Sequence, residues 1–294
     1  MNKQVLFIVN PNAGKKKFIT SEQLTTLLPK GYQGNVLFTQ RALHATELAA
    51  DAALNGVDFC FAVGGDGTVN EVANGLLNSN TVMGILPIGS GNGLARHLCL
   101  PFNWQSNINL LLHGKIVCID TLRVNKKLSV NISGLGFEGQ VAADFSKRKS
   151  RGLWGYLVTI IKTAFSYQSF EATIQYDGYT HKQTAISIAI ANASQYGNNA
   201  VIAPEASLSD ETGNLVLIQK PSLLQIILAI PAFFQGKIQS KSYIQNIRFR
   251  KATIISTSVA IHIDGEPYGH TQSVEVEVVP ASLRLLIPAA LFKY

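Results

Sequence analysis

The sequence predicts two domains: an α/β domain built on a parallel sheet, followed by a domain made mostly of β-strands. Up to about residue 120, short apolar runs alternate with helical patterns, which is typical of a parallel sheet with crossover helices. Beyond that point, short β segments separated by turn signals dominate the chain. A length of 294 residues is enough for two ordinary domains.

The stretch 59–77 carries the main signal of the first domain. The apolar run 59–63 predicts a buried strand, and apolar residues then recur with helical spacing over 69–77. Three glycines within 64–67 lie between them and let the backbone approach a ligand closely. Such a turn at the positive end of a helix suits phosphate, and an ordinary strand-turn-helix connection is the alternative.

Two side chains refine this prediction. Thr68 and Glu71 have the spacing of a capping box, which predicts that the helix begins at Thr68. Asp66 is unexpected beside phosphate, because a carboxylate repels it unless a divalent cation or a proton-transfer role is involved.

Similar loops follow other predicted strands of this domain. The strand Val5–Val9 leads into Asn10–Gly14 and three lysines, without the spacing of a Walker A motif. Asn35–Thr39 is a second strand, with Thr39 at its carboxyl end, and Met83–Pro87 precedes a loop containing Ser90 and Asn92. Open α/β sheets bind ligands at the carboxyl ends of their strands.

The second domain offers two short motifs. Gly134–Val141 matches G-x-G-x-x-G, but the acidic residue of a dinucleotide fold and the other protein-kinase motifs are missing, so we reject both functions. Asp264-Gly265-Glu266 is either a hairpin turn or a pair of carboxylates that presents a general base. The predicted principal strands are Ala185–Ala191, Leu215–Gln219, Ile247–Ile255, Val259–Ile263 and Val274–Val279.

Composition limits the partners and the compartment. The net charge of +7 favours anionic partners, namely nucleotide, nucleic acid or acidic lipid. Three cysteines without C-x-x-C spacing argue against disulfides and zinc, which fits a reducing cytoplasm. The apolar segment Leu223–Phe234 is shorter than the ~20 residues that span a bilayer.

Four ordered motifs together resemble the diacylglycerol kinase catalytic-domain family. They are Asn10-Pro11-x-x-Gly14, Gly64-Gly65-Asp66-Gly67-Thr68-x-Asn70-Glu71, Gly89-Ser90-Gly91-Asn92 and Asp264-Gly265-Glu266. The resemblance covers essentially the whole chain. It implies a phosphofructokinase- and NAD-kinase-like α/β domain over 1–122 with a C-terminal return over 283–294, a β-sandwich over 123–282, and an active site in the cleft between them.

The resemblance also implies an ATP-dependent kinase that uses Mg²⁺ and phosphorylates a lipid hydroxyl, diacylglycerol-like or sphingoid. Glu266 matches the family's proton acceptor, Asp264 is a competing assignment, and Asp66 would organise magnesium or the acceptor. The residues implied in ATP binding are Asn10, Pro11, Asn12, Ala13, Gly14, Thr39, Gly64, Gly65, Asp66, Gly67, Thr68, Val69, Asn70, Glu71 and Ser90.

Three positions depart from the family pattern. Gly93 stands where the family often has an acidic residue, and a small residue at this position resembles sphingosine kinases. Gln140, in contrast, stands where sphingosine kinases place an acid for the substrate amine. The magnesium loop is altered over 209–216, which weakens a metal role for Asp210. A soluble-substrate kinase of the NAD-kinase type and a non-catalytic nucleotide-binding regulator are the alternative functions.

A kinase of this kind has to reach a substrate held in a membrane. The cluster Lys147-Arg148-Lys149-Ser150-Arg151 precedes an aromatic, apolar helical pattern at Trp154, which is a combination found in membrane-surface contacts. A helix packed on the core after a solvated basic turn is the alternative. We therefore expect a cytoplasmic protein that is peripheral to the inner face of the membrane and has no nucleic-acid partner. A homodimer is compatible with the sequence.

Replacing Lys147, Arg148, Lys149 and Arg151 by Ser should lower vesicle binding and raise the apparent KM for lipid without changing the KM for ATP. Each basic residue near an anionic surface contributes about 1 kcal/mol, and salt screens this attraction. Co-sedimentation with anionic vesicles measures the effect. Binding that neither the substitutions nor added salt reduces would refute the membrane contact.

Overall fold

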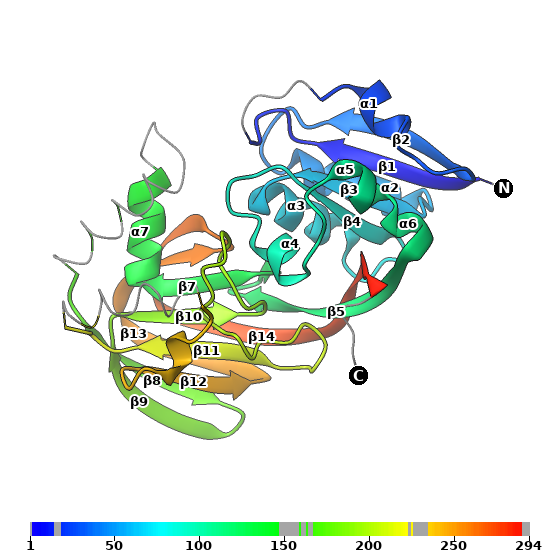
Figure 1. Ribbon diagram of the computed structural model, residues 1–294. Coiled ribbons are helices and arrows are strands. Elements are labelled where there is room, and N and C mark those ends of the chain that lie inside the picture. Colours follow the sequence, from blue (N-terminus) through cyan, green and yellow to red (C-terminus); the bar gives the residue numbers. More distant parts are fainter. Residues whose placement is uncertain are drawn as a thin grey trace. The chain divides into compact units, whose positions relative to one another are not determined.

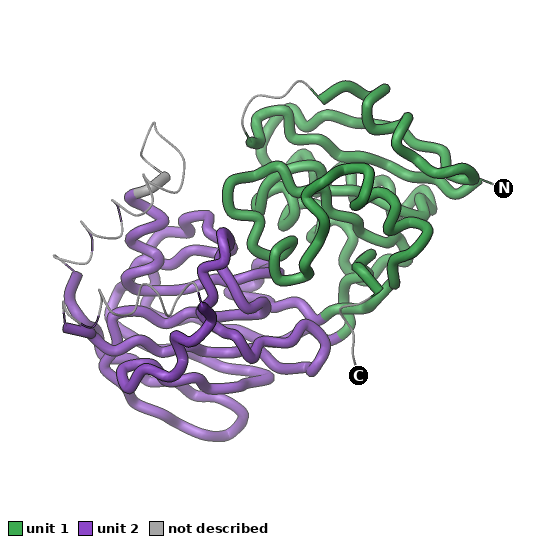
Figure 2. The backbone as a smooth tube through the Cα atoms, viewed as in Figure 1, with its two compact units in different colours: residues 1–119, 281–294 green, residues 120–280 purple. Residues whose placement is uncertain are grey.

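The computed structural model describes residues 2–14, 19–146, 159, 163, 167–222, 225 and 235–289. The chain forms two compact units, residues 1–119 with 281–294 (unit 1) and residues 120–280 (unit 2), as Figure 2 shows. The sequence predicts these boundaries between residues 122 and 123 and between residues 282 and 283. The lysines 15–17, the basic cluster 147–151, the Trp154 segment and most of 223–234 lie outside the described residues.

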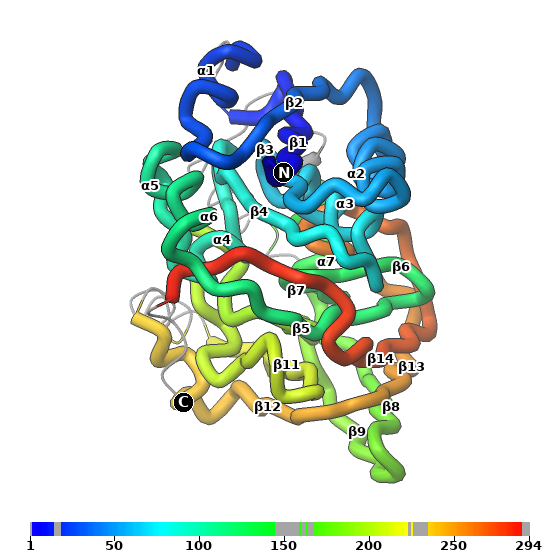
Figure 3. The backbone as a smooth tube through the Cα atoms, turned by 90° about the vertical axis from the view of Figure 1, so that its right-hand side faces the viewer, coloured from blue at the N-terminus to red at the C-terminus, as the bar shows by residue number. Residues whose placement is uncertain are grey.

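Unit 1 is built on a parallel sheet with the strand order β14-β4-β3-β1-β2 (Figures 1 and 3). This confirms the predicted parallel α/β sheet. β3 and β4 are buried along their whole length, which explains their unbroken apolar sequences. The elements are β1 (Lys3–Val9), α1 (Ser21–Thr25), β2 (Tyr32–Phe38), α2 (His44–Leu54), β3 (Phe59–Gly64), α3 (Asp66–Leu76), β4 (Val82–Pro87), α4 (Gly93–His97), α5 (Trp104–Ile108) and α6 (Leu110–His113).

Helix α3 begins two residues before the predicted start. Its N-cap is Gly65, so the predicted capping box of Thr68 and Glu71 is wrong. The Glu71 carboxylate instead accepts a hydrogen bond of 3.1 Å from the backbone N–H of Ala45, in the first turn of α2. Because Leu43 at the N-cap of α2 has no capping side chain, Glu71 takes over that role from the neighbouring helix.

Unit 2 is mainly an antiparallel sheet with the order β12-β11-β10-β7-β13-β14, and β13 also pairs with β8 of the β8–β9 hairpin. Helix α7 packs on β13. β5 and β14 begin in one unit and end in the other. The elements are β5 (Gly114–Val124), β6 (Lys127–Ser129), β7 (Ile132–Gly136), α7 (Phe137–Ser146), β8 (Phe170–Tyr176), β9 (Tyr179–Ala185), β10 (Ser187–Ala191), β11 (Gly213–Ile218), the 3₁₀ turn η1 (Ile238–Ser240), β12 (Ile244–Phe249), β13 (Lys251–Ile263) and β14 (Glu266–Pro288).

The limits of the predicted strands differ from those of the observed strands, most clearly around Arg250. The predicted strand Ile247–Ile255 is divided at Arg250 between β12 and β13, because the Asp177 carboxylate accepts the backbone N–H groups of Arg250 and Lys251 and turns the chain. The predicted Val259–Ile263 is the second part of β13. The apolar side chains of these strands form a buried core with those of β8 and β10, which is the core of a β-sandwich.

Within the described ranges, no helix is long and apolar enough to cross a membrane.

Candidate functional site

Three loops of unit 1 meet at the carboxyl ends of β1, β3 and β4. The N–H of Asn10 donates to the carbonyl of Val63 at 3.0 Å, and that of Ile88 donates to Gly64 at 2.9 Å. Gly14 has a φ of +73°, and a Cβ there would lie 2.2 Å from the Ile88 carbonyl oxygen. Only glycine therefore allows the first loop to lie against the third, at the edge where open α/β sheets bind ligands.

The Asp66 side chain links two of these loops. One carboxylate oxygen accepts the N–H of Asn92 at 2.9 Å, and the other accepts the N–H of Gly93 at 2.6 Å. Asn92 itself is in the left-handed conformation, and its amide nitrogen donates to the Gly89 carbonyl. The Asp66 carboxylate, which the sequence predicts to be catalytic, thus also fixes the loop that contains Gly89 and Asn92.

Gly65 and Gly89 bring the two loops into backbone contact. A Cβ on Gly89 would lie 2.5 Å from the Gly65 Cα and 2.8 Å from the Asn92 Oδ1. A Cβ on Gly65 would meet only the Gly89 Cα, at 3.3 Å. α3 starts directly after Gly65 without a capping side chain among the described residues, so its positive end is at this contact. The buried Oδ1 of Asn92 has no hydrogen-bond partner within the described part of the chain.

The remaining predicted residues of unit 1 have different roles. Asn10 folds the first loop: its Oδ1 accepts the N–H of Asn12, and its amide nitrogen donates to the Thr68 hydroxyl at 3.2 Å. Thr68 is buried, and its side chain occupies the space next to Gly64. Thr39 follows β2, where its N–H donates to the Val9 carbonyl. Pro11, Asn12 and Ser90 are exposed, Ala13, Gly67 and Asn70 are half-buried, and Val69 is in the core.

Two groups near these loops are uncharged at neutral pH. Burial lowers the pKa of His97, at the end of α4, to about 4. Burial likewise raises the pKa of the Cys60 thiol, in β3, to about 12. The Arg96 guanidinium lies over the ring of Phe102 at 4.8 Å, with its Nε donating to the Gly91 carbonyl. Arg96 therefore stabilises the loop that precedes α4.

The Asp264-Gly265 turn of unit 2 joins β13 to β14. Both residues have positive φ values, 46° and 87°, which is the pattern of a type I′ hairpin. The Asp264 carboxylate is buried and accepts three hydrogen bonds, from the Ser129 hydroxyl at 2.6 Å and from the N–H groups of Val130 at 2.8 Å and Asn131 at 3.1 Å.

Glu266 differs from Asp264 in every respect that matters for proton transfer. It is the first residue of β14, it is exposed, and its backbone pairs with Ile263. Asp264 is enclosed by donors that stabilise its charged form and lock its position. Of the two carboxylates, only Glu266 is open to a substrate hydroxyl, so the geometry favours it as the general base.

Asp210 is already engaged by its neighbours. It forms an ion pair with Arg248, and its Oδ1 accepts the N–H and the hydroxyl of Thr212. Within the described ranges, no group of three or more His, Cys, Asp or Glu residues could hold a metal ion. A magnesium site made by unit 2 alone has no support in this geometry.

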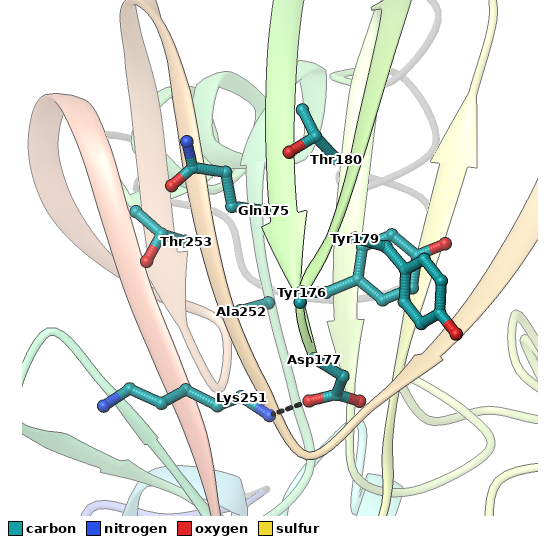
Figure 4. A pocket seen from close by; sticks show the side chains of 9 residues that line it. Gln175, Tyr176, Asp177, Tyr179, Thr180, Lys251, Ala252 and Thr253 are labelled. Carbon is teal, nitrogen blue, oxygen red and sulfur yellow. Dashed lines mark hydrogen bonds between the residues drawn. The ribbon is translucent and has the colours of Figure 1, made fainter.

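Two surface hollows of unit 2 are lined by none of the predicted site residues. One, of about 420 Å³, is at the tip of the β8–β9 hairpin, where Asp177 accepts the N–H of Lys251 and Tyr179 is exposed (Figure 4). The other, of about 440 Å³, is lined by Gln140, Asp144 and residues of β13. The Gln140 amide donates to the Asp144 carboxylate at 2.9 Å, so an acid does lie one turn beyond the position where sphingosine kinases place theirs.

Two parts of the chain each match a known protein family. Residues 4–124 match the diacylglycerol kinase catalytic domain. Residues 131–287 match the YegS C-terminal NAD kinase beta sandwich-like domain. The chain belongs to the diacylglycerol kinase catalytic-domain family. It therefore carries a kinase catalytic domain of the class that transfers phosphate to an alcohol, and a kinase of this family implies the use of ATP.

Relatives and solved structures agree with this assignment. The chain is 29% identical over 277 residues to the diacylglycerol kinase of Bacillus subtilis, covering 91% of this chain and 90% of the relative. It is 26% identical over 279 residues to that of Staphylococcus saprophyticus, covering 92% and 90%. A crystal structure of a diacylglycerol kinase from Bacillus anthracis superposes with a TM-score of 0.73 at 21% identity, over 99% and 98% of the two chains, which shows a common fold.

Substitutions of Asp264 and Glu266 should have different effects on the free energy of unfolding. Asp264→Asn should lower the free energy of unfolding by ~1–3 kcal/mol, because an amide nitrogen would then face buried N–H groups. Glu266→Gln should change it by less than about 0.5 kcal/mol, since Glu266 is exposed. Urea denaturation of both variants measures the difference. Equal stability of the two would contradict the structural role of Asp264.

Proposed function

We propose that the protein is an ATP-dependent lipid kinase that phosphorylates the hydroxyl of a diacylglycerol-like or sphingoid lipid. The observation that carries the proposal is the close contact of the glycine loops at the start of α3 in unit 1, a geometry that suits phosphate. In unit 2, the exposed carboxylate of Glu266, next to a turn held by hydrogen bonds, is the group to which we assign proton transfer. The relatives named diacylglycerol kinase, aligned over nine-tenths of their length, support a lipid acceptor.

The cradle would hold the phosphates of ATP. Gly65 and Gly89 leave the backbone uncovered at the N-terminus of α3, where amides and the helix dipole favour negative charge. Asn10 and Gly14 shape the adjoining loop, which is held to Ile88 and Val63.

Magnesium would enter with the nucleotide. Mg²⁺ is commonly held by one or two carboxylates together with substrate phosphates, so a protein cluster of acids is not required. We assign this role to Asp66, because its carboxylate lies in the first turn of α3 beside the glycine loops, where it accepts the N–H groups of Asn92 and Gly93. When bound, the ion would offset the charge of the phosphates. Asp210, paired with Arg248, is left out of the proposal.

Glu266 would take the proton of the acceptor. In the transfer, the lipid hydroxyl oxygen bonds to the γ-phosphorus as the bond from that phosphorus to the β–γ bridging oxygen breaks. ADP leaves, and the hydroxyl proton passes to the Glu266 carboxylate. Asp264 would hold the turn through its hydrogen bonds to residues 129–131. For access to lipid, we propose reversible contact with an anionic membrane through the basic cluster 147–151.

Glu266→Gln should lower kcat for lipid phosphorylation by about 10²–10⁴-fold and leave the KM for ATP unchanged, because it removes a proton acceptor and no nucleotide contact. The assay uses labelled Mg-ATP with diacylglycerol, monoacylglycerol and sphingosine, and with NAD as a soluble acceptor. Glu205→Gln, the same change at another exposed site of unit 2, is the control. Phosphorylation of NAD alone, or full activity of Glu266→Gln, would overturn the proposal.

A further inference from the structure

A chain of buried polar side chains lies behind the turn that carries Glu266. The Ser187 hydroxyl donates to one oxygen of the Glu138 carboxylate at 2.9 Å. The other oxygen of Glu138 lies 3.4 Å from the Nε2 of His262. On its far side, the His262 ring accepts the N–H of Gly265 at Nδ1, at 3.1 Å. This series of hydrogen bonds therefore ends at Gly265, the residue immediately before Glu266.

The hydrogen bonds assign the tautomer of His262. Because Nδ1 accepts the Gly265 N–H, it carries no proton, and the ring proton of the neutral imidazole is on Nε2. Nε2–H then points at the Glu138 carboxylate, which is an acceptor. Each ring nitrogen has one partner, so the orientation of the ring is fixed from both sides.

Burial makes these contacts obligatory. The His262 side chain is 5% exposed and that of Glu138 is 12% exposed. Polar groups this deep destabilise the fold unless they are hydrogen-bonded, so a rotated or missing partner would be costly. Both residues belong to unit 2, on β13 and at the start of α7.

The glycines of the 134–139 motif make room for this pair. A Cβ on Gly134 would lie 2.3 Å from the Glu138 Oε2 and 3.1 Å from the His262 Nε2. A Cβ on Gly139 would lie 2.2 Å from the Ala260 carbonyl oxygen, so this glycine lets α7 lie directly against β13. A motif that matches a dinucleotide signature by sequence thus serves to seat a carboxylate beside a histidine.

We propose that His262, oriented by Glu138, is a positioning residue for Glu266. Asp264 fixes one half of the turn through its bonds to residues 129–131, and the His262–Gly265 bond fixes the other half. Glu266 is exposed and begins a strand, so the conformation of Gly265 sets where its carboxylate points. Displacing a reacting group by about 1 Å can cost about 10²-fold in rate.

Two substitutions of His262 separate its two contacts. In His262→Asn, the side-chain oxygen stands near the position of Nδ1 and can still accept the Gly265 N–H. In His262→Gln, the amide reaches towards Glu138 but leaves Gly265 without an acceptor. The inference rests on the proposed role of Glu266, so kcat and the KM for ATP are measured with the lipid acceptor that the wild type uses. His270→Gln, on the exposed part of β14, is the matched control.

We expect kcat to fall at least tenfold in His262→Gln and no more than about threefold in His262→Asn, with the KM for ATP unchanged in both. Glu138→Gln, which keeps an acceptor for Nε2–H, should be closer to wild type than Glu138→Ala. If Glu266→Gln is inactive but His262→Gln is as active as His270→Gln, the inference about His262 is wrong while the proposed function stands.

A second readout does not depend on activity. Amide hydrogen exchange of Gly265 should be faster in His262→Gln than in His262→Asn, and ¹⁵N chemical shifts should place the His262 proton on Nε2. Should the wild type phosphorylate no lipid, the proposed function fails, yet these measurements still decide the contact. Equal Gly265 exchange in both variants would show that His262 does not hold the turn.

Discussion

The close approach of two glycine loops is the constraint on which unit 1 depends. Gly65 and Gly89 touch through their backbones, and Asp66 secures the contact by accepting two N–H groups of the second loop. Any side chain at Gly89 would separate the loops, and the start of α3 would lose its neighbour. The same contact leaves backbone amides uncovered, which is what an anion-binding site needs. Packing and binding therefore demand the same residues.

In unit 2 the three residues of the motif Asp264-Gly265-Glu266 differ in burial and in their hydrogen bonds. The Asp264 carboxylate accepts hydrogen bonds from residues 129–131 and thereby holds the turn. Gly265 supplies the positive φ that the turn requires. Glu266 is left exposed on a turn that is secured from both sides. The sequence leaves this motif ambiguous between structure and catalysis; the structure shows the structural role of Asp264, and we propose the catalytic role for Glu266.

The sequence predicted what local patterns determine. Apolar runs followed by glycine identified β1, β3 and β4 and the loops after them, because buried parallel strands have unbroken apolar sequences. The capping box failed because Thr68 and Glu71 bond to residues 58 and 26 positions away, respectively. The break at Arg250 depends likewise on the distant Asp177. Asp264 binds residues 129–131 and His262 Nε2 faces Glu138 in α7, all more than 120 positions away, so no local pattern could have identified these contacts.

The central claim is that the loops around Gly65 and Gly89 bind the phosphates of ATP. Gly65→Ala tests it most directly, because the added methyl group would meet a single neighbour, the Gly89 Cα at 3.3 Å, and would cover the amides at the start of α3. Calorimetric titration with Mg-ATP should show an affinity at least about tenfold weaker, a loss of roughly 1.4 kcal/mol, with a thermal midpoint close to that of the wild type. Unchanged ATP affinity in the folded variant would contradict the account.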